Sequence, residues 1–447
     1  MLALLILISF LEYADGFRIV CYYTNTAQYR AGGGQFLPDD IVPQLCTHIV
    51  YAFAMPTGLG IGATDENDIP TQNDTGMYER VLEIKELHPD IKILLALAGP
   101  NTNTHPYTPI LATPVSRSAF AHNVIAFLRK YGFDGLEVSW RYPDVHGKPV
   151  LNREKFVLLF KELKETFTVD GFMRNAPSLL LTAVLPGAKD IIESNYDMIG
   201  ILEYADYISL MTFDHRMSNN TLMLRTKVHD EHVEHAYFDE HDDHNERVDP
   251  DEQFSLEALI HYMKELDVAR DKLNIGITLS AATYSIDATA DLNVGSPSSG
   301  LGEPGPLTQT QGMLAYYEVC TLIKKNATII NYDAQDVRIL FNDKMWVSYE
   351  DVLSVITKVC FARDNEVGGV MVRSLDLDDF TGRFCGQGRY PLMTGIASVI
   401  RDSSCRNYVG ATHMHNGQRP LMKSSRGRIF INVGLSLVIL FFKCHAY

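Results

Sequence analysis

The chain has 447 residues, and 46% of them are hydrophobic, which is enough for a large buried core and excludes a disordered or fibrous protein. This length allows one large barrel or two ordinary domains. The formal net charge is −16, so nucleic acid is not an expected partner.

Residues 1–16 are typical of a secretory signal peptide. An apolar run from Leu2 to Leu11 is followed by Ala14 and Gly16, small residues at the −3 and −1 positions of a cut before Phe17. A buried first helix is the alternative, and the run lacks the alternation of an amphipathic helix. We therefore expect a secreted, extracellular protein, in which disulfides can form.

Eight short apolar runs then recur along the chain. They span residues 17–23, 48–54, 91–99, 135–140, 179–185, 205–213, 272–279 and 367–372, and helical patterns between them include 77–88, 116–132, 152–167 and 255–266. Apolar strands that alternate with amphipathic helices indicate parallel strands buried on both faces. The sequence therefore predicts an α/β fold, a (β/α)₈ barrel. A doubly wound open sheet is the alternative, but no G-x-G-x-x-G follows the first run.

The expected barrel covers residues 17–400. A Gly-, Pro- and Ser-rich stretch lies between the seventh and eighth runs, and it predicts a small α+β insertion subdomain at about residues 280–350. Residues 401–447 form a polar tail whose apolar end, 429–442, is too short for a comfortable membrane span. A lipid-anchor signal there would be the only route to a membrane, and a packed or disordered tail is the favoured interpretation.

The fourth apolar run ends in the stretch "FDGLEVSWRYPD", residues 133–144. Alternate side chains of a strand share a face, so Glu137, Ser139 and Arg141 should point the same way and Trp140 the other way. In a (β/α)₈ barrel, the carboxyl ends of the strands carry the chemistry. An acid, a hydroxyl and a permanent cation are an unusual set for any reaction.

Several separate stretches resemble glycoside hydrolase family 18, the chitinases and chitinase-like proteins. They are "CYYTNTAQYR", "LCTHIVYAF", "YGFDGLEVSWRYP", "LMTFD", "GPLTQTQGMLAYYEVC" and "GGVMVRSLDLDDFTGRFCGQGRYPL". The stretches are spread along the chain, and the resemblance that rests on them covers roughly residues 17–400.

The resemblance implies where a family member would carry its catalytic groups. The family signature on this strand is D-G-x-D-x-D-x-E, in which the final glutamate is the general acid and the substrate's N-acetyl group attacks with help from the preceding aspartate. Asp134 matches the first position, Glu137 the second, Ser139 the third and Arg141 the general acid. A guanidinium stays protonated and cannot give up a proton, so we predict that these catalytic positions are degenerate.

Other residues that the resemblance places in the cleft are also altered. The remnant cleft comprises Tyr22, Phe53, Met211, Phe213, Asp214 and Arg373. Phe213 replaces the family's tyrosine, and Arg373 replaces the tryptophan that forms the floor of the sugar pocket. We expect Arg141 and Arg373 to meet Asp134, Glu137 and Asp214 in a self-neutralising cluster, and an anion-binding pocket is the alternative.

The resulting hypothesis is a non-catalytic chitinase-like protein that needs no cofactor and binds an extracellular protein or glycan, in a growth-factor-like or immune-modulating role. A chito-oligosaccharide-binding lectin is the alternative, and an active hydrolase that uses unfamiliar residues is a weaker one.

Among the seven cysteines, the resemblance implies the disulfides Cys21–Cys46 and Cys320–Cys385. Cys360 lies in an apolar helical stretch and is expected to be a buried thiol. Cys405 and Cys444 remain unassigned. One cysteine at least must stay unpaired, because the number is odd.

Two further patterns concern the surface. N-glycosylation sequons begin at Asn73, Asn219 and Asn326. The acidic stretch 229–249 contains His229, His232 and His235, which would share one face of a helix and could bind a divalent ion. A solvated acidic loop without metal is the favoured interpretation.

Overall fold

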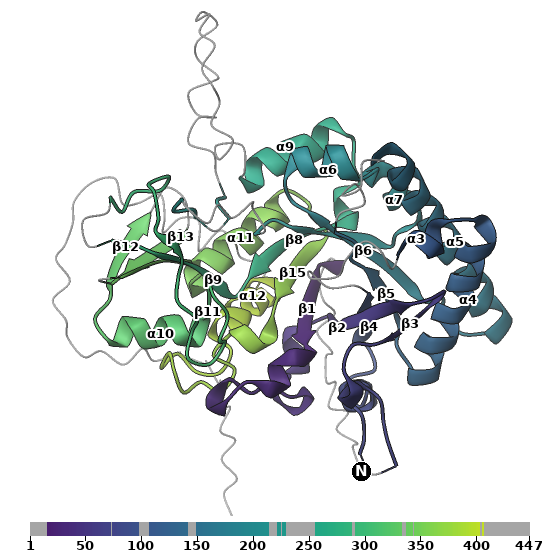
Figure 1. Ribbon diagram of the computed structural model, residues 1–447, viewed down its shortest axis with the longest axis horizontal. Helices are drawn as coiled ribbons and strands as arrows, with labels where there is room; N and C mark the ends of the chain where they lie inside the picture. The colour runs from purple at the N-terminus through teal and green to yellow at the C-terminus, as the bar shows by residue number, and fades with distance from the viewer. Residues whose placement is uncertain are drawn as a thin grey trace, which may run out of the picture.

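The structure, a computed structural model, describes residues 16–72, 74–97, 107–141, 149–213, 221–224, 226–228, 255–287, 291–332, 337–342, 344–402 and 405. Eight parallel strands form a barrel around which most of the helices lie (Figure 1). In chain order these strands are β1 (Arg18–Thr24), β2 (His48–Thr57), β4 (Lys92–Leu97), β5 (Gly135–Val138), β6 (Leu180–Pro186), β7 (Tyr207–Met211), β8 (Leu273–Thr278) and β15 (Gly369–Arg373). The barrel is closed because β1 pairs with both β2 and β15. The predicted (β/α)₈ fold is confirmed.

Helices connect the strands, as the amphipathic patterns predict. The α-helices are α1 (Met77–Leu82), α2 (Ile84–Leu87), α3 (Tyr107–Leu111), α4 (Pro114–Tyr131), α5 (Pro149–Arg174), α6 (Lys189–Asn195), α7 (Met198–Tyr204), α9 (Leu256–Glu265), α10 (Tyr316–Lys324), α11 (Val352–Asp364) and α12 (Pro391–Asp402). Short 3₁₀ segments occupy Asn25–Tyr29, Gly32–Gly34, Pro38–Asp40, Pro43–Leu45, Glu66–Asp68, Arg270–Lys272 and Leu375–Leu377. No helix of the described ranges is long and apolar enough to cross a membrane.

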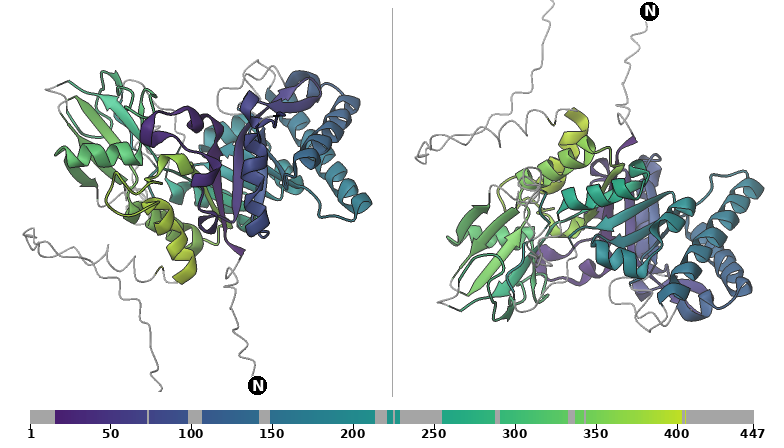
Figure 2. Two further views of the ribbon diagram at one scale, coloured as in Figure 1. Left: turned by 90° about the horizontal axis from the view of Figure 1, so that it is seen from below. Right: turned by 90° about the horizontal axis from the view of Figure 1, so that it is seen from above.

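A second, antiparallel sheet lies between barrel strands β8 and β15 in the chain. It consists of β9 (Ser280–Ser285), β10 (Gly300–Leu301), β11 (Met313–Ala315), β12 (Thr328–Tyr332), β13 (Val337–Phe341) and β14 (Met345–Tyr349). It stands on one side of the barrel, and α4 and α5 lie on the opposite side (Figure 2). A short strand, β3 (Gly60–Ala63), pairs antiparallel with β2. The expected α+β insertion is therefore part of the observed fold.

The barrel interior is filled by alternate side chains of the strands, because successive residues of a strand point to opposite faces. The apolar members are Val20, Tyr22, Val50, Ala52, Leu94, Ala96, Val184, Tyr207, Met211 and Met371. The other face of the strands packs against the helices in a larger outer core. Trp140 belongs to this outer core and stacks on Tyr107 with ring centroids 4.8 Å apart, so it points away from the barrel axis as predicted.

The chain enters β5 from α4, and the connection is set by local sequence. Thr113 accepts a hydrogen bond from the backbone N–H of Ser116 at the start of α4, which is an ordinary N-cap. Gly132 ends the helix with a φ of +96°, a conformation that costs glycine little. Phe133 then packs into the core and Asp134 begins the approach to β5.

Candidate functional site at the mouth of the barrel

Glu137 is the acidic residue that β5 directs into the barrel. In the parallel register it lies between Ala96 of β4 and Thr182 of β6, and its side chain is fully buried. The hydroxyl of Tyr22 donates a hydrogen bond to Oε1, and Oγ1 of Thr182 donates to Oε2 at 3.4 Å. The carboxyl group is thus held by hydroxyls from two other strands.

Burial controls the ionisation of this carboxyl group. Removal from water raises the pKa of Glu137 from its ordinary value of 4.5 to about 7, although Tyr22, Arg373 and Thr182 each oppose the rise. The same burial, together with the nearby carboxylate, raises the pKa of Tyr22 well above its ordinary value. Glu137 is therefore divided between its neutral and charged forms near neutral pH.

Arg373 ends β15 and lies above the aromatic side chains of the mouth. Its guanidinium carbon is 5.1 Å from the ring centre of Tyr22 and 5.4 Å from that of Phe53, which are cation–π distances. The two rings meet edge to face, with centroids 6.5 Å apart. The guanidinium of Arg373 thus lies over the rings of Tyr22 and Phe53.

Arg141 and Ser139 follow the carboxyl end of β5. Ser139 is buried and its N–H donates to the carbonyl of Leu97, which continues the pairing with β4. Arg141 is partly exposed, and its Nη2 contacts the sulfur of Met211 at the end of β7. The general-acid position of the family signature is therefore occupied by a cation at the mouth.

Asp134 does not lie at the mouth, which corrects the predicted cluster of acids. It precedes β5 at the opposite end of the barrel, where Oδ2 accepts a hydrogen bond from the N–H of Ile93 at 2.7 Å and Oδ1 pairs with Nζ of Lys85 at 2.8 Å. The prediction placed Asp134 with Arg141 because both belong to one motif, although the two positions lie at different ends of the strand.

The rest of the predicted cluster stays a prediction. Among the described contacts of Glu137 are the hydrogen bonds donated by Tyr22 and Thr182. Asp214, the third expected acid, lies outside the described residues. Met211 is buried in the barrel interior, and the partly buried Phe213 packs against the same cluster. Among the described residues, two arginines and one buried acid therefore lie at this end of the barrel.

Two polar interior residues were missed from the sequence. Thr182 reaches Glu137, and Tyr207 lies close enough for its pKa to be raised well above its ordinary value by burial and by that carboxylate. Strand parity could have found both, because "LLLTAVL" and "ADYISLMTF" place them on the same face as Val184 and Met211.

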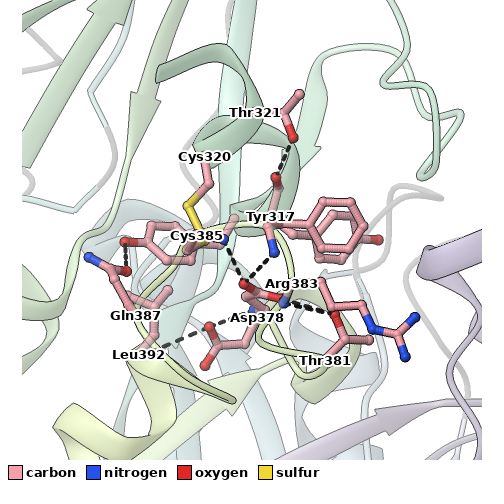
Figure 3. Close-up of a disulfide and its surroundings, with 12 residues drawn as sticks. Tyr317, Cys320, Thr321, Asp378, Thr381, Arg383, Cys385, Gln387 and Leu392 are labelled. Atoms are coloured by element: carbon pink, nitrogen blue, oxygen red, sulfur yellow. Dashed lines mark hydrogen bonds between the residues drawn. A yellow bond between two sulfur atoms is a disulfide. The ribbon is translucent and has the colours of Figure 1, made fainter. Parts of the chain in front are cut away.

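Three disulfides are present in the described part of the chain. Cys21–Cys46 joins β1 to the segment before β2, and Cys320–Cys385 joins α10 of the insertion to the loop after β15 (Figure 3). These are the two pairs that the resemblance implied. The third bond, Cys360–Cys405, corrects the expectation of a buried thiol at Cys360: the chain after α12 returns to α11 and brings Cys405 to a Cα–Cα distance of 5.4 Å.

The loop that carries Cys385 is organised by a buried acid. Oδ2 of Asp379 accepts hydrogen bonds from the N–H groups of Phe384 and Cys385 at 2.9 and 2.7 Å. The neighbouring Asp378 accepts from the N–H of Met393 at the start of α12, and burial raises its pKa to about 7. Figure 3 labels Asp378 and Cys385 of this network beside the disulfide.

Several predicted surface features fall outside the described residues. These are Asn73, Asn219, the histidines 229, 232 and 235, Cys444 and the apolar segment 429–442. Within the described ranges, no group of three or more His, Cys, Asp or Glu side chains is placed to hold a metal ion. Asn326 is described and is exposed at the end of α10.

Comparison with known proteins gives consistent matches over most of the chain. A model of glycosyl hydrolases family 18 matches residues 18–378. Chitotriosidase-1 of Mus musculus is 32% identical over 391 residues, which cover 87% of this chain and 79% of the relative. Chitinase-3-like protein 2 of Homo sapiens is also 32% identical, covering 88% of this chain and 94% of the relative.

Comparison with solved structures gives matches of the same kind. Catalytic domain 2 of the group II chitinase of Ostrinia furnacalis superposes with a TM-score of 0.76 at 31% identity, over 87% of this chain and 97% of the other. Human YKL-39, described as a pseudo-chitinase with retained chitooligosaccharide binding, superposes with a TM-score of 0.75 at 30% identity, over 88% and 100%. The similar proteins thus include both chitinases and a pseudo-chitinase, and activity must be argued from the residues at the mouth.

Proposed function

Because the chain belongs to glycosyl hydrolases family 18, we propose that it is a secreted, non-catalytic chitinase-like protein that acts by binding an extracellular protein or glycan. The observation that carries this proposal is the position of Arg141 at the carboxyl end of β5. General acid catalysis requires a group that can release a proton to the leaving oxygen, and a guanidinium cannot do so near neutral pH.

Glu137 is a poor substitute for the missing acid, although its pKa of about 7 is suitable for proton transfer. Its side chain is fully buried, and its carboxyl oxygens already accept hydrogen bonds from Tyr22 and Thr182. A catalytic acid must come within hydrogen-bond reach of the glycosidic oxygen. Arg373 above Tyr22 also stands in the way of a sugar approaching from the mouth.

Secretion is supported by the apolar amino terminus and by the cysteines. Residues 1–16 have the pattern of a signal peptide, and six of the seven cysteines form disulfides. Disulfides persist in the oxidising environment outside the cytosol. The net charge of −16 favours a partner other than nucleic acid.

Chito-oligosaccharide binding without turnover is the second candidate, favoured by the similarity to a pseudo-chitinase that retains such binding. Against it, a guanidinium lies over the ring faces of Tyr22 and Phe53. Calorimetric titration with chito-oligosaccharides of four to six sugars separates the two candidates. Absent or millimolar binding supports a different partner, and micromolar binding would move the assignment to a lectin.

Hydrolysis is tested with the same oligosaccharides between pH 3 and 9, beside an active chitinase as positive control. We expect no products from the natural chain or from Arg141→Glu, because Ser139, Phe213 and Arg373 remain in place. An inactive Arg141→Gln variant provides the matched neutral control. Clear turnover by the natural chain would refute the proposal, and turnover by Arg141→Glu alone would show that the cleft is more intact than we infer.

A further inference from the structure

The insertion sheet ends in an open edge strand. Its order is β10-β9-β14-β13-β12, so β12 pairs with β13 on one side and with no other strand of the described structure (Figure 1). An edge strand presents unpaired backbone N–H and C=O groups that can pair with a strand of another molecule. This edge is therefore open to pairing with another chain unless something covers it.

The composition of β12 increases that hazard. Residues 328–332 read TIINY, in which every residue except the asparagine is β-prone and none is charged or proline. Ile329 is 43% exposed, which is high for an isoleucine within a strand. The nearest charges in sequence are Lys325 and Asp333, which flank the strand rather than belong to it. The strand itself has none of the usual charged or proline guards.

A sequon stands directly before this strand. Asn326 lies in the turn after α10 with a φ of +65°, and its N–H donates to the carbonyl of Ile323 at 3.1 Å. Its side chain is exposed, with no hydrogen-bond partner among the described residues. Thr328, the third residue of the sequon, is the first residue of β12 and is also exposed. The Asn326 amide is therefore accessible within two residues of the open edge.

We propose that Asn326 carries an N-linked oligosaccharide whose role is to shield the β12 edge from pairing with a second strand. In the transfer, Nδ2 bonds to C1 of a lipid-diphosphate-linked oligosaccharide, the bond from C1 to the diphosphate oxygen breaks, and Nδ2 loses a proton as the lipid diphosphate leaves. The inference rests on secretion as proposed above. A hydrated glycan at this turn excludes another chain sterically, without any charge in the strand.

Occupancy is tested by mass spectrometry of peptides from protein secreted by eukaryotic cells. We expect the peptide containing Asn326 to carry a glycan that peptide-N-glycosidase removes, leaving aspartate. Glycans at Asn73 or Asn219 with an unmodified Asn326 would overturn this proposal and leave secretion intact. Failure of the chain to leave the cells, with all three asparagines unmodified, would instead refute the proposed secretion and the inference that rests on it.

The shielding role is tested with variants of the third sequon residue. Thr328→Ala destroys the sequon, whereas the matched variant Thr328→Ser keeps it with a similarly small side chain. By light scattering after size exclusion, we expect the oligomeric fraction of Thr328→Ala to rise at least about fivefold, with Thr328→Ser unchanged. Adding Ile329→Lys to Thr328→Ala should restore the monomer, because an exposed edge lysine opposes strand pairing. A monomeric Thr328→Ala protein, or equal oligomers from both variants, would overturn the shielding role.

Discussion

Replacing Glu137 with glutamine should change how stability depends on pH, because a buried acid with a raised pKa opposes folding once it is charged. Between its ordinary pKa of 4.5 and its folded pKa of about 7, the folded chain keeps a proton that the unfolded chain has released. Stability contributed by this group therefore falls as pH rises through that window and is constant above it. The separation of the two values, at about 1.36 kcal/mol per pH unit, corresponds to about 3 kcal/mol.

Glutamine removes this penalty while it preserves shape. Its amide oxygen can accept the hydrogen bond from Tyr22, and its NH₂ group can donate to Oγ1 of Thr182. We expect Glu137→Gln and the natural chain to have similar free energies of unfolding at pH 4. By pH 7.5 the variant should have gained about 3 kcal/mol relative to the natural chain, or about 4 °C in Tm for a domain of this size. Differential scanning calorimetry at half-unit pH steps measures this gain.

The natural chain alone cannot reveal the effect, because His48 acts in the opposite sense. Burial and the nearby cations Arg18 and Lys92 lower the pKa of His48 from 6.5 to about 4. The unfolded chain therefore binds that proton first, and stability falls as pH drops from 6.5 towards 4. Subtracting the free energy of unfolding of the natural chain from that of Glu137→Gln removes the contributions of His48 and Asp378, because both residues are present in both proteins. A difference that stays constant from pH 4 to 7.5 would refute the reasoning about Glu137.

The other predictions use the same calorimetry. Tyr22→Phe removes a hydrogen bond that lowers the pKa of Glu137, so the fall in stability should extend to higher pH than in the natural chain. An unchanged dependence of stability on pH would show that this hydroxyl does not control the ionisation of Glu137. Asp134→Asn and Asp206→Asn should each cost about 0.5–1 kcal/mol at neutral pH, because each removes a partly exposed ion pair with a lysine and leaves an oxygen for the backbone N–H. Neither should alter oligosaccharide titrations, and a changed titration for either variant would contradict their placement at the far end of the barrel.

Much of the fold could be predicted because the strands are buried on both faces. Each continuous apolar run became a barrel strand, and strand parity correctly placed Glu137 inside and Trp140 outside. Boundaries were less predictable: the pattern at residues 77–88 is divided between α1 and α2, and β5 ends at Val138, before Ser139 and Arg141. Periodicity reports which face a residue occupies, but the length of a strand depends on its neighbours.

Contacts between distant segments were the information that the sequence lacked. Cys360 was assigned from its own apolar helix, whereas its partner Cys405 follows a different helix and is remote in sequence. The error at Asp134 has another cause. Asp134 and Arg141 belong to one motif, but seven residues of extended chain span about 23 Å, so the spacing itself places them at opposite ends of the barrel.

If the proposed function holds, the two ends of β5 explain how this strand lost a proton donor and kept its fold. At the amino end, Asp134 holds Ile93 and Lys85, and Asp206 repeats the arrangement before β7 with Leu181 and Lys164. These contacts join neighbouring elements of the barrel and need no substrate, so they stabilise the fold whatever occupies the mouth. At the carboxyl end, Arg141 lies away from these contacts, so under the proposed function the lack of a proton donor there leaves them unchanged. Glu137 lies in β5 between Asp134 at one end and Arg141 at the other. It costs stability at neutral pH, and it takes no catalytic part in the proposed function. Its hydrogen bonds with Tyr22 and Thr182 give it a packing role, because a change in one of three hydrogen-bonded groups inside a barrel leaves another unsatisfied.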